Sequence, residues 1–155
     1  PPDTFSIVET GIYRSENIKP NHFSYLKYKT INSLIMLSEE APSKTVSNFL
    51  AENQIQLFHL GNKKSFKVNL SWKPLSEDLV KEGLELVMEP RLHPILITCT
   101  SGIHETGAFV GCLRKLQDWN FNSIVVEYRN FAKSKSRLVI EHFIELFDLD
   151  LLNLP

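Results

Sequence analysis

The sequence contains few cysteines and no long apolar run, and each shortage argues against a class of protein. Cys99 and Cys112 are the only cysteines among 155 residues, and no Cys/His spacing typical of zinc sites occurs. We therefore expect no disulfide framework, no metal and no cofactor, and a reducing, cytoplasmic compartment. No apolar stretch approaches the roughly 18 residues that cross a bilayer, so no membrane association is expected.

A strong charge excess is also missing. The formal net charge is -1, whereas general nucleic-acid binders show a clear basic excess, so nucleic acid is not an expected partner. Hydrophobic residues make up 43% of the chain, which is enough for a sizeable core, and the length favours one domain over residues 1–155. Because the sequence opens at Pro1 without methionine, we expect the natural protein to extend further at that end.

The spacing of apolar residues predicts strands and helices in alternation. A hairpin around Gly11 opens the chain, and residues 61–74 have no clean period and favour a long surface loop. Asn21 is the expected N-cap of the first helix, with Phe23, Leu26 and Tyr28 partly buried. Strands are predicted at 31–38, 55–60 and 95–98, and helices at 21–29, 44–54, 75–90, 108–119, 123–132 and 137–148. This order is typical of an α/β domain with a central, mostly parallel sheet flanked by helices.

The stretch "ILITCTSGIHETG" has the pattern of a functional loop. Cys99 follows a buried strand, at the strand end where open α/β sheets bind ligands. Backbone N–H groups from Thr100 to Thr106 are expected to converge near a helix that starts close to Gly107, which makes an anion cradle and favours a thiolate. The remaining loop residues are Ser101, Gly102, Ile103, His104 and Glu105.

This pattern matches most of the cysteine-phosphatase signature, C-x5-R-[ST]. In that chemistry a thiolate attacks phosphorus, loop amides hold the phosphoryl oxygens, and the arginine clamps two of them. Cys99 stands at the nucleophile position and Thr106 at the [ST] position, but Glu105 stands where the signature has arginine. An ordinary buried cysteine after an apolar strand is the alternative interpretation of the same residues.

Three ordered blocks resemble the plant-and-fungal atypical dual-specificity phosphatases, the Siw/Oca-type group of the tyrosine-phosphatase superfamily. They are "PPDTFSIVETGIYRS", "HPILITCTSGIHETGAFVGCLRKLQDW" and "EYRNFAKSKSRLVIEHFIELFD". The resemblance implies a cysteine-phosphatase α/β fold, phosphate bound on the cysteine loop, and substrates such as inositol pyrophosphates or phosphoproteins.

The chain departs from the family pattern at three catalytic positions. Glu105 replaces the arginine, Thr98 replaces a histidine, and "HLGNKKSF" lacks the acid of the corresponding family loop. Glu77 and Asp78 are expected to serve a helix dipole and not as general acids. Together the substitutions predict a pseudophosphatase that acts as a regulatory or scaffold subunit. A weakly active phosphatase and a noncatalytic polyanion sensor are the alternatives.

The sequence leaves the geometry of Glu105 and the ligand open. Glu105 either turns into the cradle as an internal anion or swings out and leaves the cradle open to phosphate. A basic rim for an inositol polyphosphate is one interpretation of the lysines, and a solvated charged face is the other. The rim residues are Lys63, Lys64, Lys133, Lys135 and Arg137. A hetero-oligomer with other members of the family is the expected protein partnership.

Overall fold

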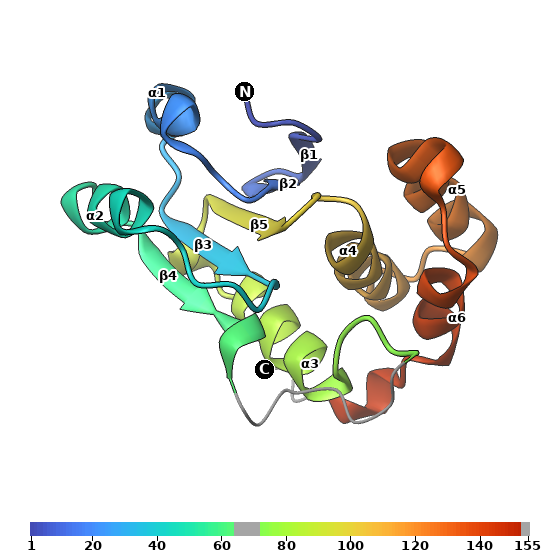
Figure 1. The fold of residues 1–155 in the computed structure, drawn as a ribbon. Helices are drawn as coiled ribbons and strands as arrows, with labels where there is room; N and C mark the ends of the chain where they lie inside the picture. Colours follow the sequence, from blue (N-terminus) through green and yellow to red (C-terminus); the bar gives the residue numbers. More distant parts are fainter. Residues whose placement is uncertain (64–71, 153–155) are drawn as a thin grey trace.

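A mixed five-stranded sheet forms the centre of the computed structural model, which describes residues 1–63 and 72–152 (Figure 1). The strand order is β1-β2-β5-β3-β4, and only the β1–β2 pair is antiparallel. The strands are β1 (Ser6–Glu9), β2 (Ile12–Glu16), β3 (Ser33–Met36), β4 (Gln56–His59) and β5 (Ile95–Cys99). The predicted α/β fold with a mostly parallel sheet is therefore confirmed.

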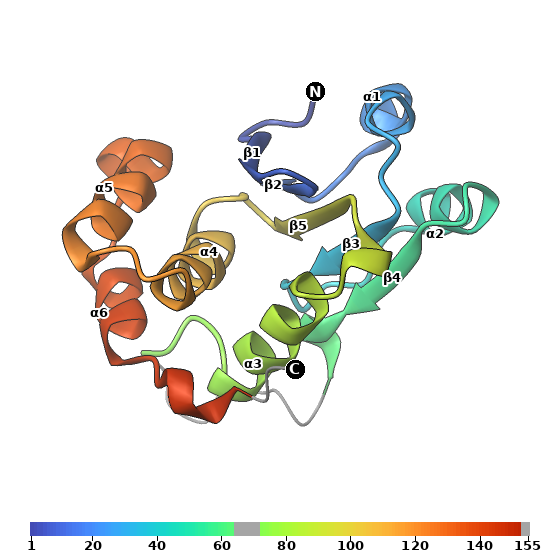
Figure 2. The same cartoon turned by 180° about the vertical axis from the view of Figure 1, so that it is seen from behind.

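Helices cover both faces of the sheet, as the two opposite views show (Figures 1 and 2). One face packs on α1 (Phe23–Tyr28) and α2 (Lys44–Glu52), and the other on α3 (Glu77–Val87) and α4 (His104–Leu116). Outside α4 lie α5 (Phe121–Ala132) and α6 (Leu138–Leu146). No helix in the described ranges has both the length and the hydrophobicity needed to cross a bilayer.

The central strand β5 owes its place to an apolar run that is buried on both faces. Ile95, Ile97 and Cys99 face the core formed with α3 and α4. Leu96 alternates with them and belongs to the second core, with α1 and α2. Because β5 ends at Cys99, the strand delivers the cysteine to the carboxyl edge of the sheet.

Several local predictions are confirmed and three are wrong. The hairpin turns at Gly11, whose φ is +83°, as expected. Asn21 caps no helix, because residues 20–22 form a 3-10 turn and α1 begins after it. Tyr28 is 77% exposed, since it lies on the outer face of a helix of only six residues. The helix α4 begins at His104 and not near Gly107, so Glu105 lies in its first turn.

The start of α3 is fixed by a serine cap beside the cysteine loop. The Ser76 hydroxyl accepts a hydrogen bond from the Leu79 N–H at 3.0 Å, and Glu77 and Asp78 occupy the first turn as predicted. Glu77 also pairs with Lys73 at 2.7 Å. The predicted surface loop at 61–74 lies mostly outside the described residues.

Candidate functional site: the Cys99 loop

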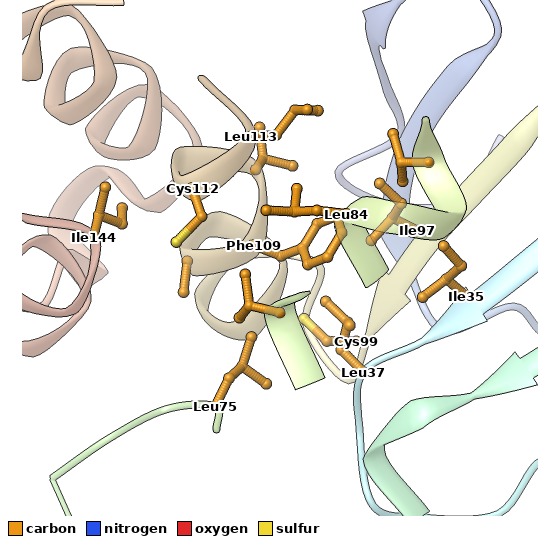
Figure 3. Close-up of a cluster of buried hydrophobic side chains, with 14 of the residues drawn as sticks. Ile35, Leu37, Leu75, Leu84, Ile97, Cys99, Phe109, Cys112, Leu113 and Ile144 are labelled. Atoms are coloured by element: carbon orange, nitrogen blue, oxygen red, sulfur yellow. The ribbon is translucent and has the colours of Figure 1, made fainter. Parts of the chain in front are cut away.

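Cys99 lies at the end of β5 with no exposed surface. Its side chain belongs to the core that Leu37 and Phe109 also form, and Figure 3 shows it in that apolar cluster. The Cys99 carbonyl accepts a hydrogen bond from the Asn17 N–H at 2.8 Å, which joins the loop to the end of β2. Cys99 is thus fixed at the base of the loop by the packing of its side chain and by the hydrogen bond to its carbonyl.

The surroundings of Cys99 keep it as a thiol. Burial raises its pKa, and the negative charge of Glu105 raises it further. The Thr106 hydroxyl and the N–H groups of Thr106 and Gly102 face the sulfur and oppose this shift. The Thr106 contact is weak, because its buried Oγ1 has no hydrogen-bond partner of good geometry. The helix start was expected to favour a thiolate and Glu105 to oppose it, and in this loop burial and Glu105 outweigh the helix start.

A buried arginine supports the loop from behind. Arg14 on β2 donates to the Gly102 carbonyl at 3.2 Å, and its guanidinium lies 3.8 Å from the ring centroid of Phe131. Burial lowers the Arg14 pKa to about 10, so the group stays charged at neutral pH. We did not predict this role. The signal was available, because Arg14 shares a strand face with the buried Ile12.

Gly102 makes the turn above Arg14 possible. Its φ is +74°, as predicted for a loop glycine, and a Cβ there would overlap Thr4 and the backbone of β2. The Thr4 hydroxyl lies 3.2 Å from the Ser101 carbonyl and 2.6 Å from the Asp3 carbonyl, and its one hydrogen is shared between them. The loop is therefore packed directly onto the N-terminal hairpin.

The start of α4 is held by a histidine–tyrosine network. The Tyr128 hydroxyl accepts from the Arg137 N–H at 3.0 Å and forms a hydrogen bond with Nδ1 of His104 at 2.9 Å. Burial and the charges of Arg137 and Lys135 lower the His104 pKa, so the ring is neutral. Gly107 lets Tyr128 approach, as predicted for close packing, since a Cβ would come 2.7 Å from its ring. His104 is thus a buried support and not a ligand contact at the mouth.

A cavity of about 380 Å³ opens beside the loop, and its charged lining is acidic. Among the described residues, the only charged side chains that line it are Glu39 and Glu105. The other lining residues are Leu37, Ser38, Gly61, Pro74, Leu75, Ser76, Leu79 and Thr100. The carboxylate of Glu105 has no hydrogen-bond or ion-pair partner within the described chain. Glu105 therefore does not fold into the cradle as an internal anion.

A second glutamate reaches the loop from the turn after β3. The Thr100 hydroxyl donates to Glu40 Oε1 at 3.0 Å, and the Asn17 side-chain amide donates to the same oxygen at 3.0 Å. We did not predict either contact, because residues 17, 40 and 100 are far apart in the sequence. The "SEEAP" turn carried the only hint, as two adjacent carboxylates after a buried strand.

The loop keeps several free backbone donors. Within the described chain, the N–H groups of Thr100, His104 and Glu105 have no acceptor, whereas the Ile103 N–H bonds to Ser101 Oγ at 3.1 Å. Such N–H groups at the start of a 13-residue helix are typical of anion sites. The backbone donors of an anion cradle are therefore present, but the charged side chains beside them, Glu39 and Glu105, are negative.

The remaining predicted residues lie around this centre. Lys63 pairs with Glu82 at 2.9 Å, and Lys64 lies outside the described residues. Lys133 and Lys135 follow α5, and Lys135 and Arg137 act electrostatically on His104. Thr98 lines an apolar cavity of about 250 Å³ on the opposite face of β5 from Cys99. The basic rim remains a prediction, since no contact joins its two halves in the described part.

An α/β fold that carries a cysteine and a helix N-terminus at the end of its central strand defines a protein of the cysteine-phosphatase class. A model of the tyrosine phosphatase family matches residues 1–154. The core catalytic domain of the PP-IP phosphatase SIW14 from S. cerevisiae is similar in structure, with a TM-score of 0.87 and 36% identity over 97% of this chain and 88% of that one.

Curated relatives agree with the structural match. The probable tyrosine-protein phosphatase DG1060 of Dictyostelium discoideum is 42% identical over 97% of this chain and 89% of its own length. The inositol diphosphatase DSP3 of Arabidopsis thaliana is 40% identical over 96% of this chain and 72% of its own length. The chain belongs to the tyrosine phosphatase family, in the Siw/Oca-type group of atypical phosphatases, and the resemblance stated above is confirmed.

Proposed function

We propose that this chain is a pseudophosphatase that serves as a regulatory or scaffold subunit in phosphate or inositol pyrophosphate signalling. One observation carries the proposal: the Glu105 carboxylate lines the cavity beside the cysteine loop and stands at the signature position where phosphoryl transfer to a cysteine needs a cation. The relatives support the signalling context, because several are named inositol diphosphatases.

The charge reversal is large enough to remove catalysis. A carboxylate about 4 Å from a phosphate charge is unfavourable by roughly 1–4 kcal/mol at effective dielectric constants of 80 to 20. Losing a bidentate guanidinium contact costs a further few kcal/mol in the transition state. Since about 1.4 kcal/mol changes a rate tenfold, the two effects together remove several orders of magnitude.

The state of Cys99 works in the same direction. Burial and Glu105 both raise its pKa, so the sulfur is a thiol at neutral pH, and the thiol is a poor nucleophile. A phosphoryl ligand that enters the cradle would meet a protonated, fully buried sulfur with a carboxylate beside it. Binding without cleavage is the outcome that this arrangement favours.

A turnover assay tests the proposal. Purified protein is given a generic aryl phosphate and, separately, an inositol pyrophosphate, with phosphate release measured beside a Cys99→Ser variant. We expect the wild-type chain to release no more phosphate than this variant. Turnover that Cys99→Ser abolishes would instead establish the weakly active phosphatase.

A noncatalytic polyanion sensor is the second candidate, and the free N–H groups of Thr100, His104 and Glu105 favour it. Calorimetry with an inositol polyphosphate tests it. A binding isotherm that saturates at one ligand per chain supports the sensor, and the absence of binding heat favours the scaffold instead. Assembly with catalytic members of the family and a cytoplasmic location remain predictions. Co-purification of the tagged chain with its relatives tests the assembly.

A further inference from the structure

The cavity that Thr98 lines, here called the β3–α2 cavity, lies on the face of the sheet opposite Cys99. It has a volume of about 250 Å³ and lies between β3, the start of α2 and the segment that follows β2. An apolar cavity of roughly 150 Å³ is large enough to hold one benzene molecule, so this cavity has room for a bicyclic ring. Most of its lining is apolar and consists of Ile18, Pro20, Leu34, Met36, Pro42 and Val46.

The charged side chains of this lining already have partners. The Lys19 ammonium lies 3.6 Å from the Glu16 carboxylate. The Glu40 carboxylate accepts hydrogen bonds from the Asn17 amide and the Thr100 hydroxyl, each at 3.0 Å. Within the described chain, Lys19 and Glu40 are the only charged residues that line the cavity. Because a charged ligand would lose hydration here without gaining a free counter-charge, the cavity favours a neutral ligand.

One polar atom among the lining residues lacks a partner. The side-chain amide of Asn17 donates to Ser38 Oγ and to Glu40 Oε1, both at 3.0 Å. Its Oδ1 is buried and has no hydrogen-bond partner among the described residues. An amide oxygen can only accept, and a buried acceptor without a donor costs free energy. A ligand that carries an N–H or O–H group supplies the missing donor, whereas a purely apolar ligand does not.

The residues around this cavity also hold the cysteine loop. The Glu40 carboxylate bonds to the Thr100 hydroxyl, and the Asn17 backbone N–H bonds to the Cys99 carbonyl at 2.8 Å. Thr98 precedes Cys99 in β5. A molecule that packs against Asn17 and Glu40 therefore restrains two residues to which the loop is bonded, although the molecule itself lies on the other face of the sheet.

We propose that the β3–α2 cavity is a binding site for a small, neutral, mostly apolar ring that carries one hydrogen-bond donor. The donor bonds to Asn17 Oδ1, the ring packs against the apolar lining, and the bound molecule holds the turn after β3 against the cysteine loop. The inference goes beyond the proposed function and does not rest on it, because no step requires a reaction or an anion at Cys99.

A titration of the whole chain, followed through its amide NMR signals, tests the inference with indole and indene. The two probes have nearly the same shape, and only indole carries an N–H group. We expect indole to give saturating shifts at Asn17 and Thr98 and to bind roughly three- to tenfold more tightly than indene, which corresponds to one neutral hydrogen bond. The signals of residues 100–103 should shift in the same titration.

Three results of this titration would contradict the inference. Shifts that do not saturate would overturn the site. Equal affinity for indole and indene would show that no ligand donor reaches Asn17 Oδ1, and would overturn the proposed ligand class. Saturating shifts that leave the signals of residues 100–103 unchanged would overturn the link to the cysteine loop.

Two matched substitutions test the location of the site. Ala41 is exposed and lines the cavity, so Ala41→Phe adds a ring at its mouth without a change in the core. Ala51 is also exposed, on α2, and does not line the cavity, so Ala51→Phe is the control. We expect Ala41→Phe to weaken indole binding at least about tenfold and Ala51→Phe to keep the wild-type affinity. Wild-type affinity in Ala41→Phe, or an equal loss in both variants, would overturn the proposed site.

Discussion

The two sides of the Cys99 loop differ in how their polar groups are satisfied. Behind the loop, Arg14 Nη2 donates to Gly102 and His104 is bonded to Tyr128, although Arg14 Nε and Thr106 Oγ1 have no hydrogen-bond partner. At the mouth, the Glu105 carboxylate has no partner in the described chain, and Glu39 lines the same cavity. The contacts behind the loop therefore stabilise the fold, whereas the Glu105 carboxylate at the mouth makes no contact that stabilises it.

This difference separates the shape of a phosphatase loop from its chemistry. The rear contacts hold the backbone whatever charge stands at the mouth, so a sequence can exchange arginine for glutamate without losing the fold. Predictions that distinguish the two sides follow from this. Substitutions behind the loop should destabilise the protein most, and substitutions at the mouth should have small effects on stability and larger effects on binding and cysteine reactivity.

Gly102→Ala should give the largest loss of stability. The new Cβ would overlap Thr4 and the backbone of β2, in a residue whose φ is +74°. Overpacking and positive-φ strain together predict a loss of about 2–4 kcal/mol in the free energy of unfolding. Urea denaturation measures it, with the exposed Ser101→Ala as a milder neighbour. A loss below about 0.5 kcal/mol would mean that the loop is not packed on the hairpin.

Tyr128→Phe should cost less, because it removes hydrogen bonds and leaves the ring. The hydroxyl joins His104 to the Arg137 N–H, and both partners would lose it. We expect a loss of about 1–2 kcal/mol in the free energy of unfolding. The same denaturation assay measures it, and an unchanged midpoint would show that water replaces the hydroxyl without cost.

The protonation of His104 should make stability depend on pH. Its pKa in the folded protein is lowered by burial and by Arg137 and Lys135, so the unfolded chain binds a proton more readily. Stability should therefore be fully present above the ordinary histidine pKa and fall as the pH drops towards the folded value. The pKa of His22 is also lowered, so His22 adds its own pH dependence in both proteins. Between pH 7 and pH 5.5, the free energy of unfolding should fall less in His104→Asn than in wild type. An equal fall in the two proteins would contradict the prediction.

The sequence predicted the elements that depend on local pattern. The alternation of apolar and polar residues, the glycines and the apolar runs were enough to place the sheet, the helices and the turn at Gly102. The position of Cys99 at the sheet edge followed from the strand that precedes it. Asn21 and Tyr28 were misplaced because a 3-10 turn shortened the first helix. An N-cap can be predicted only if the first residue of the helix is known, and here the helix begins two residues later than the sequence suggested.

The contacts that decide the character of the site join distant parts of the chain. Arg14 reaches Gly102, and Glu40 reaches both Asn17 and Thr100. No periodicity in one sequence shows such contacts. The sequence showed that residue 105 is a glutamate, but it did not show where the side chain points. Only the fold places the Glu105 carboxylate on a cavity and away from the loop N–H groups.

Thr100→Val tests the link between the mouth and the turn after β3. The substitution removes the hydrogen bond from Thr100 to Glu40 and leaves the shape of the side chain nearly unchanged. Because Glu40 is exposed and keeps its bond from Asn17, we expect a loss of only about 0.5–1 kcal/mol in the free energy of unfolding. A loss as large as that of Tyr128→Phe would place Thr100 among the supports of the loop.

Glu105→Gln should have the smallest effect on stability and a clear effect on Cys99. With no partner to lose, the substitution should change the free energy of unfolding by no more than about 0.5 kcal/mol. Removing the negative charge should lower the Cys99 pKa, so alkylation of Cys99 should accelerate. Cys112 is the internal reference, since burial is the main cause of its raised pKa and it lies further along α4, away from the loop. Faster alkylation of both cysteines would indicate unfolding, whereas faster alkylation of Cys99 alone shows that Glu105 suppresses the thiolate and does not hold the fold together.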